Sequence, residues 1–252
     1  MDRAKLLIKQ IVYTIWIASV TLVVGGIALP VPFFNREWGW RILKFWARIN
    51  MFGSKVIFRS HPKIEGLNHI PDIAGVVASN HQSNWDMLAL SIYVPRPTYV
   101  VKAELFKVPV FGWWLKALGN VGIDRSDGKS ATEAIIAASK EALDEGRQII
   151  IFPEGSRTPP DQQKRYGMGV ARIYGTFDVP CFPFTHNSGY SWSRNGFTAL
   201  PGTVTGRFLP AIQPGLSQED FIADLEVSIR KHMASRESVF EHEDVDLPTP
   251  MG

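Results

Sequence analysis

The chain has 252 residues, of which 45% are hydrophobic and 20% are charged. This length fits one domain with appendages, and the composition excludes extensive disorder. A net charge of +3 suits an anionic membrane surface or a phosphate-bearing substrate, while no nucleic-acid module is recognisable and no Cys/His group has zinc-ligand spacing.

The amino-terminal segment, residues 1–55, departs from a soluble composition. No formal charge lies between Ile11 and Phe34, and as one helix this run spans roughly 36 Å, enough for a hydrocarbon core of about 30 Å. Glycines and prolines interrupt its second half, and cations at both ends leave the membrane orientation undetermined. The chain therefore spans the bilayer once, re-enters or lies in the interface, or forms a buried core helix. A signal peptide is disfavoured because the run is too long and lacks a small-residue cleavage site.

Membrane attachment is the favoured expectation among these. Tryptophan and phenylalanine side chains mixed with arginine and lysine follow the apolar run, as in the interfacial belts of membrane proteins. These aromatic residues are Trp38, Trp40, Trp46 and Phe52.

Residues 56–236 alternate short apolar runs with amphipathic stretches. We expect strands at residues 73–79, 98–102, 121–123, 149–152, 179–185 and 203–209, and helices at residues 86–93, 130–143 and 217–235. This alternation predicts an α/β fold, with a mostly parallel sheet flanked by helices and functional groups at the carboxyl ends of the strands. The tail at residues 237–252 is acidic and contains proline, and we expect it to be poorly ordered.

The first polar motif follows the strand expected at residues 73–79. His81 and Asp86 are five residues apart, which on one ideal helix separates their directions by about 140°. They meet only if His81 precedes the helix and Asp86 lies in its first turns, with Ser83 or Asn84 as the cap. In that arrangement Asp86 fixes the imidazole tautomer and leaves the other ring nitrogen as a general base. No serine nucleophile motif accompanies the pair, so we expect a substrate to supply the hydroxyl.

The second polar motif runs from Phe152 to Arg157 and follows another expected strand. Arg157 is suited to bidentate phosphate binding, and Gly155 permits close approach of a ligand to the backbone. Glu154 either holds Arg157 or bonds a substrate hydroxyl. Each motif alone also fits a role without chemistry. His and Asp recur at this spacing by chance, and a turn such as the second motif also occurs as a surface loop. Together they predict a site that deprotonates an alcohol beside a bound anion.

With these two motifs the chain resembles the lysophospholipid acyltransferases, in particular the 1-acyl-sn-glycerol-3-phosphate acyltransferases. The similarity covers about residues 63–230, with four blocks in the family's order. The blocks are Asn80 to Asp86, Lys102 through Trp114 to Arg125, Phe152 to Arg157, and Val179 to Phe184.

The resemblance implies transfer of an acyl chain from acyl-CoA or acyl-carrier protein to the free hydroxyl of a lysophospholipid acceptor. His81 is then the general base and Asp86 its partner, with no acyl-enzyme and no cofactor or metal. The implied acceptor-binding residues are Lys102, Arg125, Glu154, Gly155, Ser156 and Arg157. The apolar stretch at residues 105–118 either lines an acyl channel or serves as core or membrane-facing surface. The implied location is a membrane surface with the active site facing the cytoplasm, the inner membrane in a bacterium.

Two departures from the family pattern bear on the acceptor. Gly122 stands where a bulkier apolar residue is usual, and Tyr166 to Gly169 stands where many members have Phe-Lys-x-Gly. The missing lysine leaves the headgroup open, with Lys164 or Arg165 as alternatives. A lyso-ornithine lipid acyltransferase, an acyl thioesterase and a non-catalytic lipid-binding membrane protein remain the other readings.

Overall fold

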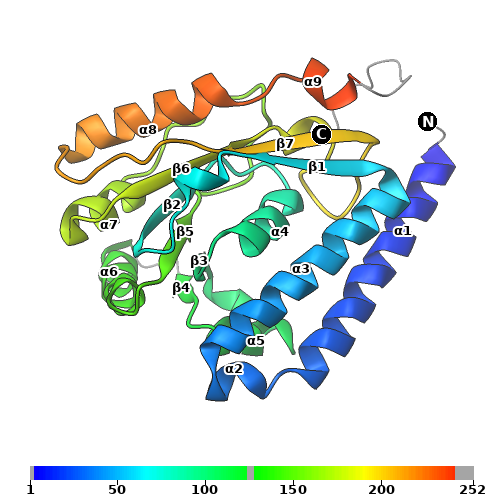
Figure 1. Cartoon of the computed structure of the whole chain (residues 1–252), viewed down its shortest axis with the longest axis horizontal. Coiled ribbons are helices and arrows are strands. Elements are labelled where there is room, and N and C mark those ends of the chain that lie inside the picture. The colour runs from blue at the N-terminus through cyan, green and yellow to red at the C-terminus, as the bar shows by residue number, and fades with distance from the viewer. Residues whose placement is uncertain (1–2, 124–127, 242–252) are drawn as a thin grey trace.

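The computed structural model describes residues 3–123 and 128–241 and is built around one mixed sheet with helices on both faces (Figure 1). Seven strands lie in the order β1-β7-β6-β2-β5-β3-β4. Their bounds are β1 Ser60–Glu65, β2 Gly75–Ser79, β3 Pro97–Lys102, β4 Val121–Ile123, β5 Gln148–Ile151, β6 Cys181–His186 and β7 Gly202–Phe208. The predicted fold class, an α/β fold with a mostly parallel sheet, is confirmed.

Strand direction decides where functional groups gather. β6, β2, β5, β3 and β4 pair in parallel, whereas β7 runs antiparallel to β6. The carboxyl ends of the five parallel strands therefore lie at one edge of the sheet. The residues that follow β2 and β5 are those of the two polar motifs, so the topology brings both motifs to the same edge.

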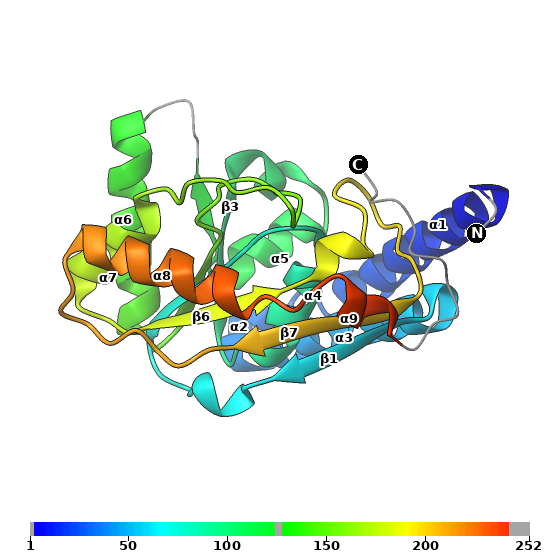
Figure 2. The same cartoon turned by 90° about the horizontal axis from the view of Figure 1, so that it is seen from above.

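Two hydrophobic cores cover the two faces of the sheet. The side chain of Val77 in β2 joins the core formed with α3 (Arg36–Phe58) and α4 (Asn84–Tyr93). Val76 and Ala78 join the opposite core, formed with α6 (Gly128–Asp144), α7 (Gly169–Phe177) and α8 (Gln218–His232). This division follows from the alternation of side chains along a strand. Figure 2 shows the helix layers on either side of the sheet.

The amino-terminal helices form an antiparallel pair beside the first core. α1 (Arg3–Val20) continues as a π-helical turn, α2 (Val31–Phe34) makes the bend, and α3 returns alongside α1 (Figure 1). Tyr13 is the buried residue of α1: its hydroxyl donates to the Asn50 carbonyl at 2.9 Å, and its ring packs edge-on against Trp192 and Phe197.

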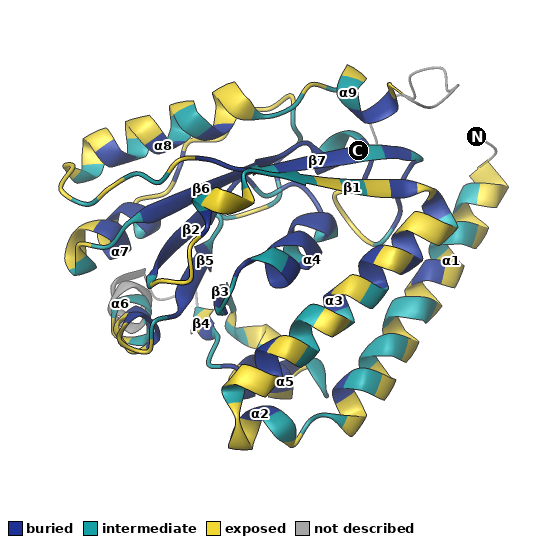
Figure 3. Ribbon diagram, in the orientation of Figure 1, coloured by how far each residue is buried: buried dark blue, intermediate teal, exposed yellow. Residues whose placement is uncertain are grey.

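The helix Arg3–Gly25 is long and apolar enough to cross a membrane, and only 6% of its apolar window is buried. The reading of this run as a buried core helix is therefore wrong. The domain boundary expected after residue 55 falls inside α3. The face of α3 opposite its buried residues carries many exposed residues (Figure 3).

At the other end of the chain, the expectation that the segment after Arg236 is poorly ordered is wrong for its first residues. Glu237–Phe240 forms the short helix α9, and Val239 and Phe240 are buried against Leu200. Residues 242–252 of the expected tail lie outside the described part.

Candidate active site

His81 and Asp86 meet at the junction between β2 and α4. Ser83 is the amino-terminal cap of α4, with its hydroxyl accepting from the Trp85 N–H at 3.2 Å, and Asp86 occupies the third helical position of a capping box. The His81 Nδ1 and Asp86 Oδ2 atoms are 2.9 Å apart. The prediction that His81 precedes the helix while Asp86 lies in its first turn is confirmed.

Asp86 is held as a buried carboxylate. It is fully buried, and its Oδ2 also accepts from the backbone N–H of Gln82 at 3.0 Å. Burial by itself would raise the pKa of Asp86, but attraction to His81 and the hydrogen bond between the two side chains outweigh it, so the pKa lies below its usual value. A carboxylate at this position accepts a hydrogen bond from the protonated Nδ1, which leaves Nε2 of the neutral ring unprotonated. The His81 ring stacks on Phe152, with the centroids 4.1 Å apart, and its side chain is 16% exposed.

A second histidine, His186, stands behind this pair at the end of β6. Its Nε2 lies 2.9 Å from the Asn80 carbonyl oxygen and 3.5 Å from Asp86 Oδ2, and the side chain is fully buried. Because a carbonyl oxygen can only accept, Nε2 carries the proton. Burial lowers the pKa of His186, which favours the neutral ring.

Two further hydrogen bonds join Asn80 to the His186 backbone. The Asn80 amide donates to the His186 carbonyl at 2.8 Å and accepts from the His186 N–H at 3.1 Å. The contact spans 106 residues, so no local sequence pattern reveals the place of His186. The result is a fixed backbone immediately before His81.

The second motif forms a tight turn beside the same loop. Gly155 has φ +70°, a conformation that favours glycine, and its N–H donates to the Phe152 carbonyl at 2.9 Å. The Thr158 N–H donates to the His81 carbonyl at 2.8 Å, which ties the turn to the first motif. Glu154 lies in this turn, and burial raises the pKa of its carboxyl group. Its Oε2 is buried with no hydrogen-bond partner among the described residues.

Arg157 is held at the amino terminus of α4. One guanidinium nitrogen donates to the Asn84 side-chain oxygen, and the other donates to the Arg194 carbonyl at 2.8 Å. In the described part of the chain no ion pair joins Glu154 to Arg157, so of the two alternatives for Glu154 the one in which it holds Arg157 is wrong. The Asn84 amide in turn donates to the Gly196 carbonyl at 2.6 Å, so the β6–β7 loop supports both side chains.

Arg194 is a cation that sequence reasoning missed. It is exposed. Burial lowers the pKa of Arg157, and repulsion from the positive charge of Arg194 lowers it further. Two guanidinium groups near each other form a setting that an anion stabilises.

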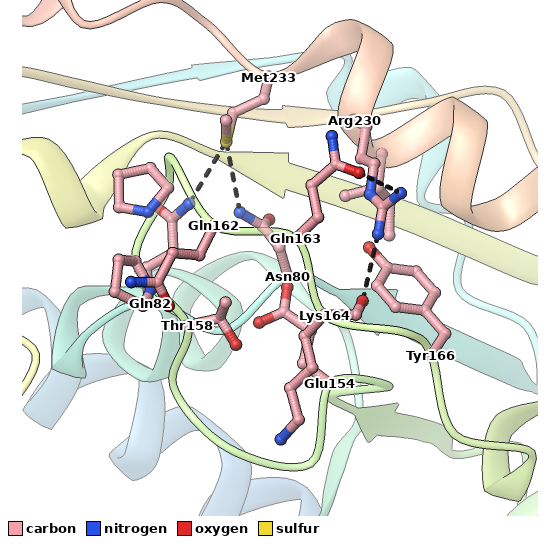
Figure 4. A pocket seen from close by; sticks show the side chains of 13 residues that line it. Asn80, Gln82, Glu154, Thr158, Gln162, Gln163, Lys164, Tyr166, Arg230 and Met233 are labelled. Carbon is pink, nitrogen blue, oxygen red and sulfur yellow. Dashed lines mark hydrogen bonds between the residues drawn. The ribbon is translucent and has the colours of Figure 1, made fainter.

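A pocket of about 160 Å³ lies beside the loop that follows β2 (Figure 4). Asn80 and Gln82, on either side of His81, line it together with Glu154 and Arg230. Arg230 donates to the Gln163 side chain and to the Lys164 carbonyl, both at 3.2 Å, and so attaches the loop after the second motif to α8 (Figure 4). The Lys164 amine donates to Ser156 Oγ at 2.8 Å, so this alternative cation does lie at the motif.

Two predicted binding residues are not joined to this group. Lys102 ends β3 and is exposed at the same sheet edge, but it does not line the pocket. Arg125 lies outside the described residues. Among the residues that the structure describes, no cluster of three His, Cys, Asp or Glu side chains is arranged to hold a metal ion.

The apolar stretch at residues 105–118 takes part in packing against the amino-terminal helices. Trp114 and Leu118 form a small core with Trp40, and the Trp114 indole donates to the Gly25 carbonyl at 2.8 Å. Trp113, by contrast, is 50% exposed. These contacts favour the core and surface readings of the stretch.

The acyltransferase family model matches residues 61–187, a range that contains both polar motifs. The chain belongs to the acyltransferase family. The resemblance found in the four sequence blocks is thereby confirmed, and the protein is an acyltransferase by family.

Two curated relatives extend the comparison. The 1-acyl-sn-glycerol-3-phosphate acyltransferase of Pseudomonas aeruginosa is 29% identical over 81% of the chain and 80% of its own length. The 1-acyl-sn-glycerol-3-phosphate acyltransferase alpha of Mus musculus is 28% identical over 92% of the chain and 81% of its own length.

A solved structure shows the same fold. The crystal structure of the 1-acyl-sn-glycerophosphate (LPA) acyltransferase PlsC from Thermotoga maritima superimposes with a TM-score of 0.73 at 23% identity. The match covers 90% of this chain and 95% of that one.

Proposed function

We propose that the protein transfers a fatty acyl chain from acyl-CoA or acyl-carrier protein to the free hydroxyl of 1-acyl-sn-glycerol-3-phosphate, giving phosphatidic acid. The observation that carries this proposal is the 2.9 Å contact between His81 Nδ1 and the buried Asp86 carboxylate. It supports an imidazole oriented for proton abstraction in a member of an acyltransferase family. The names of both curated relatives support the acceptor.

The reaction needs only one base. Nε2 of His81 takes the proton of the acceptor hydroxyl while the oxygen attacks the thioester carbonyl. The C–O bond forms, the C–S bond breaks, and the imidazolium returns the proton to the departing thiolate. Asp86 stabilises the imidazolium between these transfers, and no acyl-enzyme is required. Positioned general-base catalysis contributes roughly 10²–10⁴ in rate.

The acceptor phosphate is proposed to lie between Arg157 and Arg194. A phosphate there would relieve the repulsion between the two guanidinium groups and gain charge-assisted hydrogen bonds. Lys164, attached to Ser156, is the cation proposed to replace the lysine that many members carry two residues before Gly169. Gly155 leaves room for a ligand against the backbone, while Lys102 and Arg125 are proposed as outer contacts at the same sheet edge.

The protein is further proposed to work at a membrane surface, with the site facing the cytoplasm. Exposed aliphatic side chains of α1, such as Ile11 and Ile15, support insertion into lipid. A lysophospholipid acceptor would then reach the site from the same bilayer.

The experiment compares wild type with His81→Ala and with His61→Ala, a matched control at an exposed position of β1, in purified enzyme. Thiol release from the donor is measured with and without acceptor, over a panel containing 1-acyl-sn-glycerol-3-phosphate and a lyso-ornithine lipid. We expect acceptor-dependent release with the phosphate-bearing lipid, lowered at least about 10²-fold in His81→Ala alone. Near-normal turnover in that variant would contradict the base.

Acceptor-independent release with free fatty acid as product would instead identify a thioesterase. Preference for the lyso-ornithine lipid would retain the mechanism and change the acceptor. No release under any condition, from a folded wild type, would favour a non-catalytic lipid-binding protein.

A further inference from the structure

The outward face of α3 differs in character from that of α1. Along α3 the exposed aromatic residues Trp38, Phe45 and Phe52 recur at intervals of seven. Arg41, Arg48 and Lys55 recur at the same interval between them, and at 100° per residue all six positions fall within one stripe of about 100°. α1 presents aliphatic side chains instead, with its cations confined to the first half of the helix. The α3 face thus combines apolar and cationic groups in one strip.

A groove of about 300 Å³ lies along this strip, between α3, the start of β1 and the carboxyl-terminal end of α4. Met51 and Ile92, both largely buried, form its floor, and Phe52 and Tyr93 form part of its sides. Its volume suits a segment of an acyl chain. The groove is separated from the candidate active site by the length of α4, roughly 15 Å, and shares no lining residue with the pocket beside the loop that follows β2.

Two cations, Arg48 and Lys55, stand on the rim of this groove seven residues apart. Neither takes part in an ion pair or side-chain hydrogen bond with the rest of the described chain, whereas Arg41 on the same strip lies 3.9 Å from Glu37 and stacks over Trp38. The rim therefore presents two positive charges about two helical turns apart, roughly 10 Å along the axis. Their long side chains can converge on one anion between them.

We propose that this α3 groove binds one anionic phospholipid of the surrounding membrane. The headgroup phosphate lies between Arg48 and Lys55, and an acyl chain covers Met51 and Ile92. Charge complementarity selects the negative headgroup, and the apolar floor requires a chain, so free phosphate alone is a poor ligand. The bound lipid is not the acceptor: it anchors α3 in the interface and needs neither His81 nor Arg157.

The experiment measures lipid retention by the full chain in detergent micelles, using native mass spectrometry during titration with phosphatidylglycerol or phosphatidylcholine. Micelles remove the extended charged surface, so retention reports a discrete site. The variants are Arg48→Glu/Lys55→Glu, which reverses the rim charge, and Ile92→Trp, which fills the floor without changing charge. Lys140→Glu/Lys231→Glu, on helices over the opposite face, is the matched control for net charge, and His81→Ala tests independence from the active site.

We expect wild type to retain one phosphatidylglycerol in preference to phosphatidylcholine. Since each cation near an anionic lipid contributes roughly a factor of five, the rim variant should bind about 25-fold more weakly or worse. Ile92→Trp should also lose retention, while the control pair and His81→Ala match wild type. Melting temperatures close to wild type, measured for every variant, establish that each is folded.

Equal retention of the two lipids, unchanged binding in the rim variant, or loss only in His81→Ala would overturn the proposal. Competition by millimolar inorganic phosphate would identify a plain anion site rather than a phospholipid groove. A concentration-dependent dimer that excludes lipid would assign the groove to a second copy of the chain. Because the site is read without catalysis, its failure leaves the proposed acyl transfer untouched.

Discussion

Two regions of this molecule reverse the usual distribution of side chains, in opposite directions. At the carboxyl edge of the sheet, Asp86 and His186 are polar and fully buried. In the amino-terminal helices, Ile15 and Leu22 are apolar and 60% and 64% exposed. Buried polar groups and exposed apolar patches are the two departures that carry information about function.

The two regions therefore differ in the substitutions that they tolerate. A buried polar atom must keep a specific partner, because losing it leaves an unsatisfied group that costs about 1–3 kcal/mol. An exposed aliphatic side chain needs only an apolar environment, and its contribution is roughly proportional to area. Substitutions at the sheet edge should therefore act sharply on turnover, and substitutions on α1 should act gradually on membrane binding.

The largest effect is expected from Asp86→Asn. The amide keeps the size of the side chain but no longer stabilises the imidazolium, and it permits the wrong tautomer of His81. By the behaviour of comparable His–Asp pairs, kcat should fall about 10³–10⁴-fold, measured in the acceptor-dependent assay at saturating substrate. Asp72→Asn, in an exposed loop, is the matched control. A loss of less than tenfold would show that the carboxylate does not serve the base.

A smaller effect is expected at His186. His186→Phe fills the space but removes the ring N–H that donates to the Asn80 carbonyl beside Asp86, which should lower kcat about 10- to 100-fold. His186→Gln can offer an amide N–H at the same place and should recover most of that loss. Equal activity of the two variants would assign His186 to packing alone.

The same pair of variants has a pH signature. Burial lowers the pKa of His186 below its ordinary value of 6.5, so the unfolded chain binds a proton that the folded chain excludes. Its contribution to stability is therefore full above pH 6.5 and declines as the pH falls from there towards the lowered pKa. In urea unfolding, His186→Gln should lose stability less steeply than wild type over that range. Parallel curves would contradict the neutral assignment.

Substitution of Arg157 or Arg194 should weaken acceptor binding more than it lowers turnover. Arg157→Ala should raise the acceptor KM about 10- to 100-fold, because a charge-assisted hydrogen bond contributes roughly 1.5–3 kcal/mol. Arg194→Ala, on the exposed loop, should act in the same direction and less strongly. Lys231→Ala serves as a surface control, and an unchanged KM in both arginine variants would argue against the phosphate site.

The smallest single effects are expected on α1. Ile11→Ser and Ile15→Ser each remove one exposed aliphatic side chain and should weaken vesicle binding about tenfold, with the double variant close to the product of the two. Thr14→Ser, between them, is the matched control. Flotation with lipid vesicles gives the measurement. An abrupt loss from either single change would mean that α1 has a specific contact and not a general apolar one.

Local sequence patterns revealed the parts of the fold that local forces determine. The strand at β5, which is almost wholly isoleucine, is unambiguous, and the helix start was narrowed to a cap at Ser83 or Asn84. β1 was missed because Ser60–Glu65 alternates polar residues around a proline, typical of an edge position. α7 was missed because it begins at Gly169 and has no side-chain cap.

The site was predictable only in part for a related reason. His81 and Asp86 are close in sequence, and their geometry follows from one strand-to-helix turn. His186 and Arg194 reach the site from β6 and the loop after it, across 106 residues for the Asn80 contact and 37 for the Arg157 contact. Contacts of that separation depend on strand order, which no single motif encodes.

One contact of α1 has a practical meaning for anyone wishing to handle this enzyme in water. Tyr13 supports Trp192 and Phe197, the ends of the same loop whose carbonyls hold Arg157 and Asn84. Removing the first helix to obtain a detergent-free preparation would therefore remove the packing that supports this loop and, through it, Arg157. The exposed, apolar amino-terminal helix is therefore also part of the packing around the candidate active site.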